Sequence, residues 1–266
     1  MSHPAPEVAV LAGGGKTGRA LARALATAGA RARPLGRTDL ADPVGALRGC
    51  SAAYVMAPNL HPDEASYVEG WLDAARRAGV ARVVHHSVAS PHAPDMPHHL
   101  AKAAAEDLVR RSGLSWTLLQ PCAYVQNLVP GLRADPPVLR VPYDPDRPFG
   151  LVDLADVAEA AARVLLDPVG GAHDGATYEL GGPRAVTVRD VAATASAVLG
   201  RAVVLEQVTP AEAVAGLEAR EAAWLTAMFA YYDAHGLPTG GVPLAALLDR
   251  APSDLTTTLV RELATP

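Results

Sequence analysis

The 266-residue sequence has little of what marks several protein classes. It has only two cysteines, Cys50 and Cys122, and these lack the spacing of a metal site and do not suggest a disulfide scaffold. Lys and Arg total 23 against 28 Asp and Glu, and the resulting net charge of −5 provides no basic field for nucleic acid. We therefore expect no metal centre and no nucleic-acid partner.

Long hydrophobic runs are also missing. No apolar run reaches the roughly 20 residues that cross a bilayer, and the first residues lack the charged-then-apolar pattern of a signal segment. We expect a cytoplasmic protein with no membrane partner, present as a monomer or homodimer. Half of the residues are nevertheless hydrophobic, which is enough for a sizeable core.

A glycine-rich turn lies near the N-terminus. Residues 8–11 predict a short buried strand, and a helix with Leu21 and Leu25 on one face follows the turn. Glycines let the backbone approach a diphosphate, and the free N–H groups and dipole at a helix N-terminus favour its negative charge. We expect such a site to consist of Gly13, Gly14, Gly15, Lys16, Thr17 and Gly18.

Two phosphate-binding motifs fit this turn unequally. Gly15-Lys16-Thr17 looks like the end of a Walker A loop, but Val10 stands where that motif requires its first glycine. A G-x-x-G-x-x-G dinucleotide motif fits better, with Ala12, Gly15 and Gly18 at its three positions. An ordinary strand–turn–helix rich in small residues is the alternative, and the place of the turn after an N-terminal strand favours the dinucleotide motif.

Strands and helices are predicted to alternate after this turn. The expected strands are residues 30–37, 52–58, 81–88, 115–120 and 177–180, and the expected helices are residues 43–48, 63–78, 98–112 and 154–166. This alternation is typical of an α/β fold with a Rossmann-type doubly wound parallel sheet. The segment from Arg37 to Asp42 is too short for the helix and third strand usual there, so we expect a shortened crossover.

The C-terminal part has a looser pattern. Residues 130–148 are rich in proline and predict an excursion over the top edge of the sheet. Residues 203–208 predict a strand, and residues 210–266 are mostly helical. We expect a smaller, mostly helical C-terminal domain that covers a pocket. The expected division is 1–125 with 150–182 for NAD(P) binding, and 126–149 with 183–266 for substrate binding or a lid.

The end of the second expected strand bears on the cofactor. NAD-selective folds place an acidic residue there, whereas this chain has Gly36 and Arg37. A guanidinium suits a 2′-phosphate, so we expect NADP(H) to be preferred over NAD(H), unless Arg37 is only a solvated strand end. Lys16 and Arg33 are further cations expected near it. Other cofactor contacts are expected from Asp39, Leu40, Ala57 and Pro58.

Blocks along the chain resemble the NmrA-like group of atypical short-chain dehydrogenases. They are residues 10–19, 54–58, 115–121 with Asn127, 151–158 and 178–183. Their order and spacing carry the resemblance, which covers nearly the whole chain. It implies a Rossmann domain that binds NAD(P) and a smaller substrate domain. Members include quinone and enone reductases, benzylic ether and isoflavone reductases, natural-product ketoreductases, and redox-sensing regulators without turnover.

One departure from the wider superfamily concerns the catalytic residues. Its Y-x-x-x-K motif lacks the tyrosine here, because His98 stands four residues before Lys102. Carbonyl reduction needs a group that protonates or stabilises the developing alkoxide. We expect His98 to donate the proton, Lys102 to hold the nicotinamide ribose and Ser87 to bind the substrate oxygen. The alternatives are that the histidine is merely solvated, and that water or Tyr124 delivers the proton.

Other polar and aromatic residues have competing interpretations. Tyr124 and Asn127 follow Pro121, where the family places substrate-pocket residues, although Tyr124 is equally suited to packing between domains. Asp153 and Asp156 are predicted to be a helix cap and a first-turn acid rather than a catalytic pair. Large side chains crowd one helical stretch and are expected to form core or to face the pocket: Trp224, Met228, Phe229, Tyr231 and Tyr232.

These features predict an NAD(P)H-dependent oxidoreductase. Its expected substrate is a ketone, quinone or enone on a small apolar molecule, aromatic or polycyclic and of natural-product type. Two alternatives remain: an NADP(H)-sensing binding protein without turnover, and a non-redox cyclase or isomerase on the same scaffold.

Overall fold

The computed structural model describes residues 5–264, which form two compact units. The first unit takes in the described residues up to Pro91, with Ala101–Gln120 and Val157–Tyr178. The second takes in His92–Leu100, Pro121–Asp156 and the described residues from Glu179 onward. No helix in residues 5–264 has the length and apolar character needed to span a membrane.

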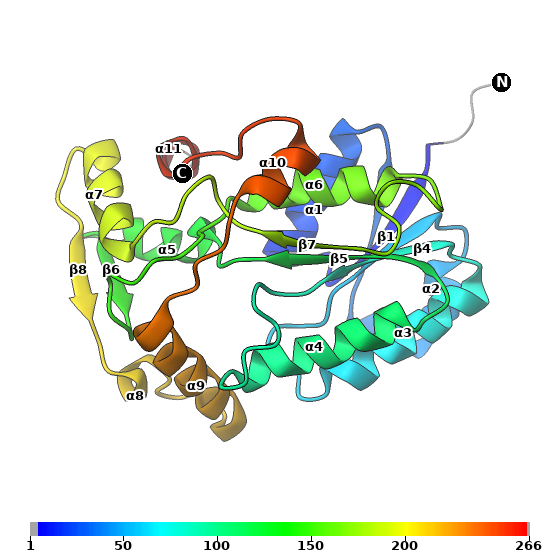
Figure 1. The fold of residues 1–266 in the computed structure, drawn as a ribbon, viewed down its shortest axis with the longest axis horizontal. Coiled ribbons are helices and arrows are strands. Elements are labelled where there is room, and N and C mark those ends of the chain that lie inside the picture. The colour runs from blue at the N-terminus through cyan, green and yellow to red at the C-terminus, as the bar shows by residue number, and fades with distance from the viewer. Residues whose placement is uncertain (1–4, 265–266) are drawn as a thin grey trace. The chain divides into compact units, whose positions relative to one another are not determined.

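The first unit is built on a six-stranded sheet in the order β2-β1-β3-β4-β5-β7 (Figure 1). Its strands are β1 (Glu7–Leu11), β2 (Arg31–Leu35), β3 (Ala52–Val55), β4 (Arg82–His86), β5 (Ser115–Pro121) and β7 (Ala176–Leu180). β1 pairs in parallel with β2 and β3, β3 with β4, and β4 with β5. The prediction of a Rossmann-type doubly wound parallel sheet is confirmed.

Helices cover both faces of this sheet, as Figure 1 shows, with α3 and α4 on one face and α1 and α6 on the other. The helices are α1 (Lys16–Thr27), α2 (Pro43–Leu47), α3 (Glu64–Ala78), α4 (Pro97–Arg110) and α6 (Leu154–Leu166). On the α3 and α4 face, Val55 and Val83 from the sheet share a buried core with Trp71, Ala75 and Val109. The central strands are buried on both sides, as an apolar parallel sheet requires.

The expected short crossover is confirmed, and it makes β2 the edge of the sheet. A 3₁₀ turn at Arg37–Ala41 leads directly into α2, which Asp42 caps by accepting the Gly45 N–H at 2.9 Å. The chain then enters β3 on the other side of β1. β2 is correspondingly exposed, and Pro34 occupies this edge strand, where the missing N–H is tolerated.

The second unit contains a two-stranded parallel sheet and several helices. Its strands are β6 (Val138–Val141) and β8 (Val204–Gln207), and its helical elements are η2 (Val125–Asn127), α5 (Val129–Leu132), α7 (Val188–Leu199), α8 (Pro210–Ala213), α9 (Ala219–His235), α10 (Val242–Leu248) and α11 (Leu255–Ala264). The strand expected at 203–208 is present as β8. The excursion expected at 130–148 lies in the second unit, and it contains two short elements that were not expected, α5 and β6. Prolines flank the four residues of β6, and the strand that pairs with β6, β8, lies far along the chain.

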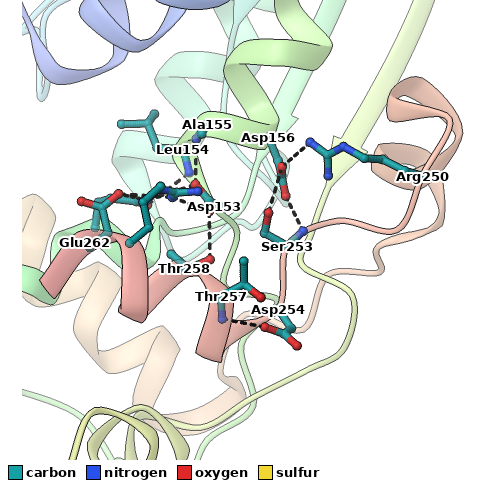
Figure 2. Close-up of polar contacts among 12 residues, drawn as sticks. Asp153, Leu154, Ala155, Asp156, Arg250, Ser253, Asp254, Thr257, Thr258 and Glu262 are labelled. Atoms are coloured by element: carbon teal, nitrogen blue, oxygen red, sulfur yellow. Dashed lines mark hydrogen bonds and ion pairs between the residues drawn. The ribbon is translucent and has the colours of Figure 1, made fainter. Parts of the chain in front are cut away.

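Two buried carboxylates join the start of α6 to the C-terminal segment (Figure 2). Asp153 accepts hydrogen bonds from the Ala155 N–H at 2.8 Å and the Thr258 hydroxyl at 2.9 Å, and pairs with Arg261 at 2.6 Å. Asp156 pairs with Arg250 at 2.8 Å. The prediction of a cap and a first-turn acid is confirmed, and both acids also hold chain segments about a hundred residues away.

Candidate functional site

The glycine-rich turn connects β1 to α1 at the carboxyl end of the sheet. The Gly13 N–H donates to the Leu35 carbonyl at 3.1 Å, and the Gly15 N–H donates to the Ala12 carbonyl at 2.9 Å. Gly15 is the N-cap of α1 and has no side chain to accept from the first-turn amides. The N-terminus of α1 therefore has no side-chain cap, and the positive end of the helix dipole at such a terminus favours an anion.

The turn tolerates side chains at some positions and not at others. A Cβ on Gly13 would lie 2.5 Å from the Pro34 Cβ, and one on Gly18 would lie 2.5 Å from the Gly13 Cα. A Cβ on Gly14 would meet nothing within 4 Å. Ala12, the departure from the motif, has φ +50°, a conformation that favours glycine. Gly13 and Gly18 are thus required by close backbone packing.

The end of β2 presents a guanidinium to solvent. Arg37 is exposed, and its side chain makes no hydrogen bond or ion pair within residues 5–264. Asp39 accepts the Gly36 N–H at 2.7 Å, and Leu40 is 50% exposed. Arg33 was wrongly expected here: it pairs with Glu7 at the opposite end of β1 and donates to two backbone carbonyls.

The ends of β3 and β4 carry the other predicted cofactor residues. Ala57 is buried and Pro58 is half-buried just after β3. Lys102, in α4, is buried and pairs with Glu64, the first residue of α3, at 2.8 Å. Because α3 and α4 follow loops from the carboxyl ends of β3 and β4, this ion pair lies in the region where parallel sheets bind ligands.

A second buried carboxylate, that of Glu106, lies on α4 one turn after Lys102. Glu106 accepts hydrogen bonds from the Ser87 hydroxyl at 2.5 Å and from the Gln120 amide at 2.7 Å, and it pairs with Arg110 at 3.2 Å. A serine hydroxyl has one proton to donate, so Ser87 would have to release Glu106 before it could serve a substrate oxygen.

Sequence reasoning missed Glu64 and Glu106. A usable signal exists in the helical period, since Glu64 is in phase with Val68 and Leu72 on the apolar face of α3. Glu106 is likewise in phase with Val109, a buried core residue three positions later on α4. An acid on a core-facing stripe indicates a buried carboxylate that requires partners.

Two adjacent histidines on β4 are held neutral. Burial, followed by the charge of Lys102, lowers the pKa of His85 and of His86 to about 3. The His85 Nδ1 contacts the Val55 carbonyl at 3.0 Å, which makes Nδ1 the protonated nitrogen. His86 contacts the Tyr54 hydroxyl at 2.5 Å on the other face of the sheet, and burial raises the pKa of Tyr54.

These histidines should make the protein sensitive to mild acid. Between pH 6.5 and 3 the unfolded chain binds protons at His85 and His86 that the folded chain does not, so stability falls as pH falls. Urea unfolding at pH 7.5 and 5.5 should differ by about 1.4 kcal/mol for each histidine. Replacement of exposed His92 by Gln should leave this dependence unchanged. Equal stability at the two pH values would contradict the assignment.

The second unit contains the remaining predicted catalytic and substrate residues. His98, near the start of α4, is buried, and its ring centroid lies 6.0 Å from that of Trp224 on α9. Tyr124 is buried and Asn127 is exposed. Most of the large residues on α9 are only partly buried, and Tyr232 is the buried residue of this helix. They are therefore not a simple core stripe.

A hollow of about 520 Å³ also lies in the second unit. Its lining residues include Pro142, Thr209, Phe229 and Asp233. None of the predicted site residues except Phe229, which was weighed as core or pocket, lines it.

The sheet order and the glycine turn define a Rossmann-type α/β protein. The family profile described as NmrA-like family matches residues 36–261, and the chain belongs to that family. The resemblance predicted from the sequence blocks is confirmed.

Two curated relatives are named as reductases. The chain is 34% identical over 168 residues to the (4-alkanoyl-5-oxo-2,5-dihydrofuran-3-yl)methyl phosphate reductase of Streptomyces griseus, covering 61% of this chain and 56% of that protein. It is 32% identical over 184 residues to the NAD(P)H azoreductase of Xenophilus azovorans, covering 64% of this chain and 61% of that protein. The chain thus spans less than two thirds of either relative.

A solved structure shares the fold over almost the whole chain. The NADPH-dependent quinone oxidoreductase of Escherichia coli, in complex with NADPH, aligns with a TM-score of 0.80 and 21% identity. The alignment covers 96% of this chain and 99% of that one.

Proposed function

We propose that the protein is an NAD(P)H-dependent oxidoreductase that prefers NADPH and reduces a ketone, quinone or enone on a small apolar molecule of aromatic or polycyclic natural-product type. The observation that carries the proposal is the turn around Gly13 and Gly18, where close backbone packing leaves an uncapped helix N-terminus. The reductase names of the two curated relatives support the same activity.

The residues of the first unit fit a dinucleotide. A diphosphate needs backbone amides without a competing side-chain acceptor, and the Gly15 cap provides this condition. The exposed Arg37 provides a cation for a 2′-phosphate, and Lys102 provides ammonium donors for ribose hydroxyls. The proposed cofactor residues are therefore those of the turn, Gly13, Gly14, Gly15, Lys16, Thr17 and Gly18, together with Arg37, Asp39, Leu40, Ala57, Pro58 and Lys102.

A bound dihydronicotinamide supplies a hydride, and the protein must provide or admit one proton to complete a carbonyl reduction. We assign this proton to His98, because an imidazole is the side chain that ordinarily exchanges a proton near neutrality. Tyr124 and Asn127 are assigned to orienting the substrate. Lys102 is assigned to holding the nicotinamide ribose.

Cofactor preference is tested at Arg37. Arg37→Ala should weaken NADPH binding about tenfold or more, the usual effect of losing a charged hydrogen bond, and should leave NADH binding nearly unchanged. Arg31→Ala is the matched control, because Arg31 is exposed on the same edge strand and pairs loosely with Glu7 at 3.8 Å. Equal losses for the two nucleotides, or tighter binding of NADH by the wild type, would defeat the preference for NADPH.

Proton delivery is tested at His98. His98→Phe should lower kcat by about 100-fold, the lower range for general acid catalysis, and leave the Kd for NADPH within about twofold. His99→Phe, at the neighbouring buried histidine, is the control. Unchanged kcat in His98→Phe would remove it from the mechanism and favour Tyr124 or water.

A second candidate is an NADP(H)-sensing protein without turnover. It is favoured by the replacement of the superfamily's tyrosine with His98, whose ring lies against Trp224. Absorbance of reduced nicotinamide with a panel of quinones, enones and ketones separates the two. Oxidation of NADPH supports the reductase, whereas binding without oxidation across the panel supports the sensor. A chain that binds neither nucleotide would leave the non-redox cyclase or isomerase.

A further inference from the structure

We infer that Glu64 is a positioning residue for the cofactor, acting through its ion pair with Lys102. The inference rests on the proposed function, in which Lys102 holds the nicotinamide ribose. Glu64 is 1% exposed, and its Oε1 accepts from the Lys102 Nζ at 2.8 Å.

The position of the pair argues for a role beyond stability. Glu64 begins α3 directly after the loop from β3, and Lys102 lies in the second turn of α4, which follows the loop from β4. A parallel sheet binds its ligand at this carboxyl edge. The first unit has another buried cation, Arg82, but Arg82 is the first residue of β4 and thus lies at the amino edge, where Asp167 contacts it at 3.7 Å.

The Glu64–Lys102 pair does not use all of its hydrogen-bonding groups. An ammonium has three N–H donors, and Glu64 uses one of them, which leaves donors for ribose hydroxyls. Glu64 Oε2 is buried and accepts no hydrogen bond within residues 5–264. A buried carboxylate that served stability alone would be expected to have both oxygens satisfied.

Glu64 provides the negative charge beside Lys102, because the other titratable groups near Lys102 are neutral or already paired. The neighbouring groups on β4, His85 and His86, are neutral near pH 7, since burial lowers the pKa of each to about 3. On α4 itself, Glu106 stands four residues after Lys102 and is already bound to Ser87, Gln120 and Arg110. Loss of the Glu64 charge would leave a buried ammonium without an anionic partner.

A double-mutant cycle tests this assignment. The Kd for NADPH is measured by fluorescence titration in wild type, Glu64→Gln, Lys102→Met and the double variant. If Glu64 acts through Lys102, each single change weakens binding about tenfold, and the double variant binds no more weakly than Lys102→Met. Asp167→Asn, which removes the charge beside Arg82, should lower the melting temperature and leave the NADPH Kd within about twofold.

Each outcome has a defined meaning. Wild-type affinity in a folded Glu64→Gln variant, or losses that simply add in the double variant, would overturn the inference and leave the reductase proposal intact. Failure of the wild type to bind NADPH would instead defeat the proposed function. Glu64→Asp serves if Glu64→Gln does not fold. Aspartate keeps the negative charge but is one methylene shorter, so the carboxylate lies further from Lys102. Glu64→Asp should bind NADPH with an affinity between those of wild type and the double variant. Wild-type affinity in Glu64→Asp would overturn the inference.

Discussion

Gly18→Ala should abolish measurable NADPH binding, whereas Gly14→Ala should leave the Kd within about twofold. A Cβ on Gly18 would lie 2.5 Å from the Gly13 Cα and 2.6 Å from the Gly13 carbonyl oxygen, so the backbone of the turn would have to move. A Cβ on Gly14 meets nothing within 4 Å. Displacing the turn misaligns the first-turn amides of α1 that the diphosphate needs. Loss of two or more such hydrogen bonds to a charged group, at about 1.5–3 kcal/mol each, would raise a micromolar Kd to the order of millimolar, beyond routine detection.

Stability is measured on the same two variants. Forcing a methyl group into a packed turn costs about 1–3 kcal/mol, so Gly18→Ala should remain folded with a lowered melting temperature. NADPH should then raise the melting temperature of wild type and Gly14→Ala, and should have no effect on Gly18→Ala. Equal NADPH affinity in folded Gly18→Ala would show that the turn does not seat the diphosphate.

Asp153→Ala should lower the free energy of unfolding by about 3–5 kcal/mol, because it leaves several buried donors and a cation without their acceptor. The carboxylate accepts from Ala155, Thr258 and Arg261, and thereby joins the start of α6 to α11 (Figure 2). Urea unfolding gives the value directly.

The matched control for Asp153 is Glu159→Ala on the same helix. Glu159 is only partly buried and pairs with Arg163 one turn away at 2.8 Å, so its loss should cost less than about 1 kcal/mol. A cost for Asp153→Ala as small as that of the control would show that the carboxylate is not what holds α11 in place.

The local features of the fold could be predicted from the sequence. The turn at Gly13 to Gly18, the alternation of elements and the short crossover after Arg37 depend on neighbouring residues and helical or strand periods. The pairing of β6 with β8 could not be predicted, because four apolar-patterned residues between prolines give no sign of a partner more than sixty residues away. Strand pairing at that separation is decided by the rest of the fold.

The candidate site, too, has parts that could be predicted from the sequence and parts that could not. Arg33 and Arg37 are both basic residues near the second strand, but only their direction in the folded sheet shows that Arg33 reaches back to Glu7 while Arg37 faces solvent. The ion pair of Glu64 with Lys102 joins two helices, so neither helix alone reveals it. The burial of the aromatic residues of α9 could not be predicted, because these residues occupy several faces of the helix. Trp224 and Phe229 are only partly buried, and no helical period in the sequence indicates this.

Calorimetric titration of the wild-type protein with NADPH, and separately with NADH, tests the central claim most directly. We expect saturable binding of one nucleotide per chain, with a Kd for NADPH on the order of micromolar, a weaker Kd for NADH, and no detectable binding in Gly18→Ala. Absence of binding by the wild type for both nucleotides would contradict it.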